Sequence, residues 1–133
     1  MTICGNLNCS QCCHDREVIL THSDIEKLLT MGHYEQTFAR PSRWGQNLKE
    51  LIFYNGTCIF LEGGKCSVYG NRPTACRIFP VTLGDDGPEL DLSCPHRENF
   101  KHDSSFMTQA NSGLKRIVED VQNTIARANK VDN

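Results

Sequence analysis

The sequence lacks any long apolar run: no window of its 133 residues approaches the roughly 18 consecutive apolar residues of a membrane-spanning helix. It also has little net charge, -2 at pH 7, so its composition predicts neither nucleic acid nor an anionic membrane as a partner. The N-terminus has no basic segment followed by an apolar one, which leads us to expect no signal peptide. These absences predict a cytosolic protein in a reducing compartment.

Motifs of common enzyme classes are absent too. The sequence has no G-x-G-x-x-G, no P-loop and no nucleophile elbow, and Gly63-Gly64 is typical of a hairpin turn rather than of a phosphate-binding loop. A motif for a methyl donor is also missing. The sequence therefore predicts no defined reaction, and an activity that depends on a bound metal cluster stays open.

Cysteine is what the sequence has in excess, with eight in all. In a reducing compartment such a number indicates metal binding or catalysis more often than disulfides. The first four fall within ten positions, and the others are spread over the middle of the chain near predicted turns or helix ends. We expect folding to gather all eight into one metal-binding region: Cys4, Cys9, Cys12, Cys13, Cys58, Cys66, Cys76 and Cys94.

The cysteine spacing leaves three kinds of chemistry open. Cys4-x4-Cys9-x2-Cys12 has the gaps of plant-type ferredoxins, which favours an iron–sulfur cluster. A 4Fe-4S cluster is the type we expect, although this spacing does not itself select the cluster type. Zinc also takes four cysteines, but the paired C-x2-C halves of a zinc ribbon are missing. The third alternative is a reactive Cys12-Cys13 pair that acts as a redox switch or transfers metal without holding it permanently.

The first third of the chain predicts few regular elements. Residues 18–20 form an apolar run typical of a short strand. A helix is expected to follow, with Ser23 as its N-cap, Glu26 completing a capping box and Gly32 at its end. The polar stretch 33–47 is expected to be a loop, with at most a helical turn.

The middle of the chain carries turn signals, and its end carries helical periodicity. A helical turn is expected to begin near Pro73, and a hairpin to have Asp86-Gly87 near its tip. From Asp103 to Ala128 apolar residues recur at helical spacing, which predicts a long amphipathic helix. Short strands are expected around three dipeptides: Asn55-Gly56, Gly63-Gly64 and Gly70-Asn71.

Together these elements predict an α+β fold. We expect a small cysteine-rich metal-binding domain with short hairpins, a short N-terminal helix and a long C-terminal helix. It is expected to form one domain over residues 1–133, with a motif-bearing core at 1–98 and a helical segment at 99–133.

The order of the motifs resembles that of a known family. "CSQCCHDREVILTHSDIEKL", then "GTCIFLEGGKCSVYGNRPTACRIFP", then a late cysteine are similar to the YkgJ-type cysteine-cluster proteins. Zinc or iron chelation is attributed to that family, and flagellin lysine methylases are associated with it. The likeness covers about residues 4–94, and its most specific part is C-x2-C-C, C-x-F-L and C-x-V-Y-x-x-R-P-x-x-C-R-x-F-P in this order.

The resemblance implies one metal-binding unit made of every cysteine except Cys4. That residue departs from the family pattern, because the first gap here is four residues instead of two or three. The family description covers zinc and iron alike and does not choose between them. Its methylase relatives are linked with clusters, which favours iron–sulfur.

Arginines and aromatic residues lie beside the central cysteines. A guanidinium near a thiolate-ligated cluster would reduce its negative charge, so Arg72 and Arg77 are candidate cofactor-binding residues. Alternatively, one or both anchor the turn through backbone carbonyls. Phe60, Tyr69 and Phe79 are expected to pack around the site and limit its access to water.

The sequence thus predicts a cytosolic iron–sulfur cluster-binding protein that transfers electrons or is an accessory in metal or sulfur handling. Its expected partner is a redox or client protein, with no nucleic acid and no membrane. One alternative is a zinc-binding structural or interaction module. Another is a cluster-dependent enzyme or methylation-associated accessory.

Overall fold

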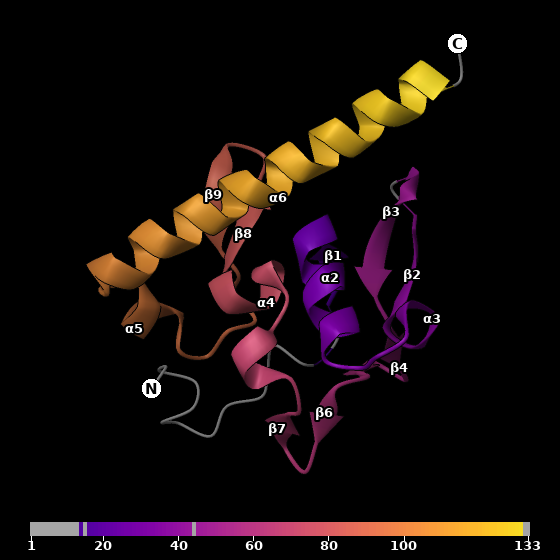
Figure 1. Cartoon of the computed structure of the whole chain (residues 1–133). Coiled ribbons are helices and arrows are strands. Elements are labelled where there is room, and N and C mark those ends of the chain that lie inside the picture. The colour runs from indigo at the N-terminus through magenta and orange to yellow at the C-terminus, as the bar shows by residue number, and fades with distance from the viewer. Residues whose placement is uncertain (1–13, 15, 44, 132–133) are drawn as a thin grey trace.

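The computed structural model describes residue 14 and residues 16–43 and 45–131. Short helices and small antiparallel sheets are combined with one long C-terminal helix (Figure 1). The predicted α+β class is therefore confirmed. Within the described ranges, no helix is both long and apolar enough to cross a membrane.

A three-stranded antiparallel sheet lies near the start of the described chain. It contains β1 (Ile19–Leu20), β2 (Ala39–Ser42) and β3 (Gly45–Leu51) in the order β1-β3-β2. The prediction for 33–47 is confirmed for its helical turn, which is α3 (Glu35–Phe38), but the predicted loop is wrong where β2 and the start of β3 lie. The strand β2 is a polar edge strand with a proline, so it shows no apolar alternation in the sequence.

The helix α2 (His22–Thr30) begins earlier than predicted. Its N-cap is Thr21, and the capping box is completed by Asp24, not by Ser23 and Glu26. The predicted end is confirmed: Gly32 follows the helix with a φ of +97°, a left-handed conformation that glycine adopts without strain.

Three two-stranded hairpins follow the sheet, each at a predicted turn. The strands are β4 (Phe53–Tyr54) with β5 (Thr57–Cys58), β6 (Leu61–Glu62) with β7 (Lys65–Cys66), and β8 (Val81–Gly84) with β9 (Gly87–Leu90). Asn55, Gly56, Gly63 and Gly64 all have positive φ, as a tight hairpin turn of two such residues requires. Gly70-Asn71 is an exception, because it lies in a short 3-10 helix, η2 (Tyr69–Asn71), and not between strands.

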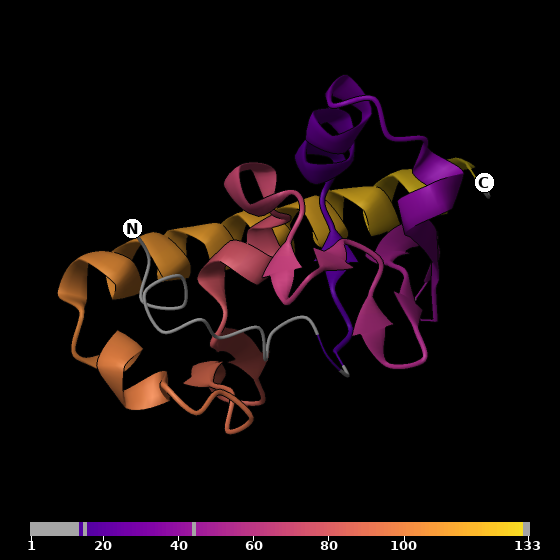
Figure 2. The ribbon, with the colours of Figure 1, turned by 90° about the horizontal axis from the view of Figure 1, so that it is seen from below.

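Three helices complete the fold. The predicted turn after Pro73 is α4 (Thr74–Ile78), and α5 (Arg97–Lys101) was not predicted. The long predicted helix is α6 (Ser104–Val131), and its expected cap is confirmed by the bond from the Phe106 N–H to the Asp103 carboxylate, 2.9 Å. It lies on one side of the molecule and the β6–β7 hairpin on the opposite side, with α2 and α4 between them (Figures 1 and 2).

The helix α6 packs closely on α4. A Cβ placed on Gly113 would lie only 2.7 Å from Ile78 Cγ2, so the glycine permits this approach. Around it, Ile78 and Val81 pack with Ala110 and Leu114.

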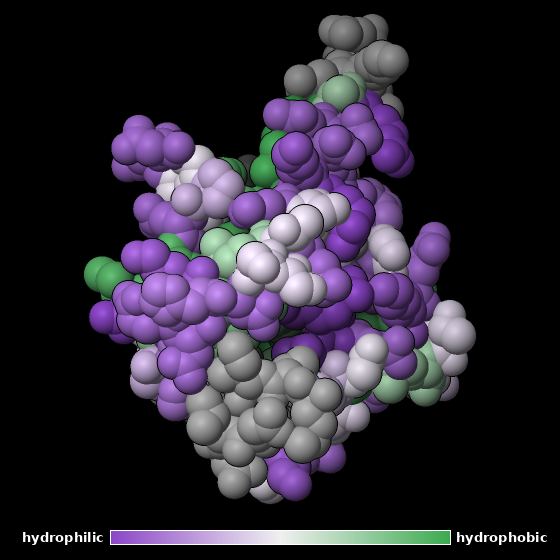
Figure 3. Space-filling model, turned by 90° about the vertical axis from the view of Figure 1, so that its left-hand side faces the viewer, coloured by the Kyte–Doolittle hydropathy of each residue, from purple (hydrophilic) through white to green (hydrophobic). Residues whose placement is uncertain are grey.

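The described residues on the face that contains the start of α6 are mainly hydrophilic (Figure 3).

The main core lies between the sheet, α2 and the first hairpins. Cys58 belongs to this core itself, and Cys66 and Cys76 pack against it. The fold therefore brings cysteines from β5, β7 and α4 to one apolar cluster. Its buried members are Val18, Leu20, Leu28, Phe38, Leu51, Cys58, Phe60 and Val68.

Candidate metal centre

The eight candidate ligands divide into two groups. The N-terminal group lies outside the described residues: Cys4, Cys9, Cys12 and Cys13. In the other group, Cys58 is the last residue of the β4–β5 hairpin and pairs with Phe53. Cys66 is the last residue of the β6–β7 hairpin and pairs with Leu61. Cys76 lies in α4, and Cys94 follows β9.

Cys58 is the most central of the described cysteines that share the main core. Its side chain is 7% exposed, and the Phe60 N–H donates a hydrogen bond to Cys58 Sγ at 3.5 Å. A backbone N–H directed at sulfur is the kind of contact that tunes a metal-bound thiolate. The tight β4–β5 hairpin fixes this geometry because Cys58 is the last residue of its second strand.

Cys94 has a different apolar environment. It is 1% exposed and packs with Phe79 and Phe100 in a separate small cluster. Phe79 follows Cys76 by three residues, so one short segment of chain connects the two environments. Among the residues that the structure describes, no three cysteine, histidine or acidic side chains form a group that would hold a metal ion. The described cysteines therefore do not complete a site by themselves.

The residues that follow the N-terminal cysteines are attached beside the central ones. His14 forms an antiparallel bridge with Thr57, the neighbour of Cys58. Arg16 donates from Nη2 to the Ala75 carbonyl at 3.3 Å, and its guanidinium lies 4.2 Å from the centre of the Phe79 ring. Sequence reasoning missed Arg16, since no local pattern distinguishes this arginine from a surface residue.

A buried carboxylate fixes the helix that carries Cys76. Asp24 is 2% exposed, and its Oδ1 accepts from the Thr74 N–H at 3.0 Å and from Thr74 Oγ1 at 2.9 Å. Its Oδ2 accepts from the Thr21 N–H at 3.0 Å. Asp24 thereby joins the start of α2 to the start of α4 and positions Cys76. Sequence reasoning missed Asp24, because it assigned the capping box to Ser23 and Glu26 and because the partner on α4 lies 50 residues away.

The two predicted cofactor-binding arginines have local partners. Arg72 donates from Nε to the Tyr69 carbonyl at 3.0 Å and lies 4.0 Å over the Tyr69 ring, so it anchors the turn. Arg77 donates from Nη2 to Thr74 Oγ1 at 3.1 Å. Of the expected aromatic shell, Phe60 and Phe79 are buried, but Tyr69 is 39% exposed, so that part of the expectation is wrong. The role of either arginine toward a cofactor stays a prediction.

The donor set suits a soft or borderline metal. Thiolates select zinc or iron–sulfur clusters, whereas carboxylate and carbonyl oxygens suit magnesium and calcium. All four described cysteines are buried or half-buried, and three of them contact one apolar core. Such a setting fits a zinc- or iron-chelating centre.

Comparison with known proteins gives one match. Residues 3–107 match the family model "CxxCxxCC: Putative zinc- or iron-chelating domain". No curated protein and no solved structure matches the chain. The matched residues contain all eight cysteines and end within the first turn of α6. The chain therefore belongs to the CxxCxxCC family of zinc- or iron-chelating domains, as the resemblance of its motifs implied.

Proposed function

We propose that the protein is a cytosolic iron–sulfur protein whose cluster, of the 4Fe-4S type, serves electron transfer or metal and sulfur handling. One observation carries this proposal: Cys58, Cys66 and Cys76 come from three separate elements and contact the same core. His14 and Arg16, which follow the N-terminal cysteine run, lie beside two of these three elements.

Chain connectivity supports a shared site for the two groups of cysteines. Cys13 is bonded to His14, and consecutive Cα atoms are about 3.8 Å apart. Because His14 pairs with Thr57, the residue that directly follows Cys13 in the chain lies beside the neighbour of Cys58. We therefore assign Cys9, Cys12, Cys13, Cys58, Cys66 and Cys76 to one thiolate site, with Cys4 and Cys94 as further candidates.

Several residues would tune such a site. When bound, the cluster would supply one-electron chemistry. The Phe60 N–H donates to Cys58 Sγ, which places positive character next to that sulfur. Phe60 and Phe79 are buried and limit the access of water to the cysteines near them. Arg77 lies next to Cys76 in the chain and would contribute positive charge near the thiolates. A redox or client protein is the partner that these roles require.

The test uses protein purified without oxygen. We expect a brown protein with a broad absorption band in the visible range. Reduction with dithionite should bleach this band, and the reduced protein should give a signal in electron paramagnetic resonance. Cys58→Ser and Cys76→Ser should each reduce the iron content strongly, whereas the exposed Ser67→Ala next to Cys66 should not. A colourless protein with stoichiometric zinc and no sulfide would overturn the cluster proposal and favour a structural zinc module.

A further inference from the structure

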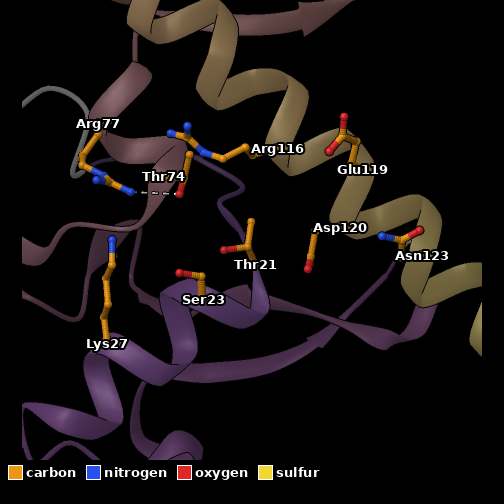
Figure 4. Close-up of a pocket in the computed structure, with 9 residues that line it drawn as sticks. All are labelled: Thr21, Ser23, Lys27, Thr74, Arg77, Arg116, Glu119, Asp120 and Asn123. Atoms are coloured by element: carbon orange, nitrogen blue, oxygen red, sulfur yellow. Dashed lines mark hydrogen bonds between the residues drawn. The ribbon is translucent and has the colours of Figure 1, made fainter.

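A cavity of about 370 Å³ lies between α2, α4 and α6 (Figure 4). None of the cysteines that the structure describes is among its lining residues. Its volume is near the lower end of the roughly 300–1,000 Å³ of small-molecule pockets. The cavity therefore has room for a small ligand, and its lining indicates which chemistry that ligand has.

Three cationic side chains line the cavity, one from each helix. Lys27 comes from α2, Arg77 from α4 and Arg116 from α6, and Figure 4 shows them toward the same end. Within the described chain, no carboxylate forms a salt bridge with any of the three. Their charges are thus not neutralised by a described acidic partner.

The two acidic residues that line the cavity, Glu119 and Asp120, form no salt bridge with the three cations in the described part of the chain. Asp120 accepts from His22 Nδ1 at 3.0 Å, so one of its oxygens already has a partner on α2. Glu119 is exposed, and Figure 4 shows it with Asp120 and Asn123 toward the opposite end of the cavity. The cavity is therefore cationic at one end and rich in hydrogen-bond acceptors at the other.

Arg77 is held in place before any ligand arrives. Its Nη2 donates to Thr74 Oγ1, and the same hydroxyl donates to the buried Asp24. The Arg77 Nε atom is buried and has no hydrogen-bond partner among the described residues. The guanidinium charge has no acidic partner among the described residues, so an anion in the cavity that accepts from its other nitrogens would be stabilised.

We propose that this cavity binds the phosphate group of a small molecule, held by Lys27, Arg77 and Arg116. Three converging cations favour a phosphate dianion over a single carboxylate, and a fixed guanidinium matches phosphate geometry. The hydroxyl of Thr74 orients Arg77, and Ser23 adds a second hydroxyl to the lining. At the opposite end, Asn123 and the acidic side chains accept hydrogen bonds from hydroxyl groups on the rest of the ligand.

The test measures binding of inorganic phosphate and of glycerol 3-phosphate to the full-length, metal-loaded protein by calorimetry. Ionic strength is held constant with chloride. We expect saturable binding of the phosphate group, with the ester bound more tightly than free phosphate if the ligand is a phosphorylated small molecule. Equal affinities would identify free phosphate as the ligand. Absence of saturable binding by both would overturn the proposal.

Variants locate the binding to the cavity. Lys27→Gln and Arg116→Gln should each weaken binding by about tenfold or more, since each removes a charge-assisted contact. Lys115→Gln, which removes an exposed lysine next to Arg116 that does not line the cavity, should bind as the unaltered protein does. Unchanged binding in both cavity variants would contradict the assignment. Their metal content should equal that of the unaltered protein, which separates this proposal from that of the metal centre.

Discussion

Replacement of Asp24 by alanine should destabilise the protein strongly, because this carboxylate joins two helices in the interior. It accepts from the N–H groups of Thr21 and Thr74 and from the Thr74 hydroxyl, and all three residues are buried. The hydroxyl can rotate toward another acceptor, but the two N–H groups cannot.

The expected magnitude follows from these unpaired donors. Each buried N–H left without an acceptor costs about 1–3 kcal/mol, so Asp24→Ala should cost about 4 kcal/mol. That is a large part of the roughly 5–15 kcal/mol that stabilises a typical domain. Asp24→Asn keeps the shape and one acceptor oxygen but turns an amide NH₂ toward the other donor, so it should cost about 2 kcal/mol.

The assay is denaturant unfolding of the metal-loaded protein without oxygen, with Glu26→Ala as a control because Glu26 is exposed on the same helix. Since Asp24 positions the helix of Cys76, the alanine variant should also lose metal to a chelator faster than the control. Equal unfolding midpoints and equal rates of metal loss in Asp24→Ala and Glu26→Ala would refute this reasoning.

Two other substitutions test the packing around the site. Gly113→Ala should destabilise by about 1–2 kcal/mol in a thermal melt, because the steric cost against Ile78 exceeds the gain in helix propensity. Gly70→Ala, where a Cβ meets open space, should change stability by less than about 0.5 kcal/mol, and a larger loss there than at Gly113 would contradict the packing. Arg16→Gln should cost about 1–2 kcal/mol and speed metal loss, since it removes the contacts with Ala75 and Phe79. The exposed Arg127→Gln should do neither, and an Arg16 variant that behaves like it would argue against a structural role for the Arg16 contacts beside Cys76.

Local turn chemistry made much of the fold predictable. A tight two-residue hairpin turn requires positive φ at both central residues, and Asn55-Gly56 and Gly63-Gly64 are pairs that adopt it readily. These dipeptides therefore predicted two hairpins, which have Cys58 and Cys66 at their ends. The long C-terminal helix was equally clear from its periodicity.

Elements defined by distant contacts were not predictable. Two overlapping capping patterns lie at the start of α2, and the buried bond between Asp24 and Thr74 favours the one that begins at Thr21. Strand β2 is polar and lies at a sheet edge, so nothing in its own sequence marks it.

The candidate site, like the fold, was predictable only where local sequence determines it. The cysteines were evident from their number and spacing, and the family match confirms a zinc- or iron-chelating domain. Their supports were not evident, because Arg16 and Asp24 act through partners 59 and 50 residues away. Which cysteines bind the metal stays a prediction, since four of the eight lie outside the described residues.

The central claim is that the thiolates of this chain hold an iron–sulfur cluster. The most direct measurement is the iron, acid-labile sulfide and zinc content of the full-length protein purified without oxygen. We predict iron and sulfide in equal amounts, at about four of each per chain for one 4Fe-4S cluster, and little zinc. Stoichiometric zinc with neither iron nor sulfide would contradict it.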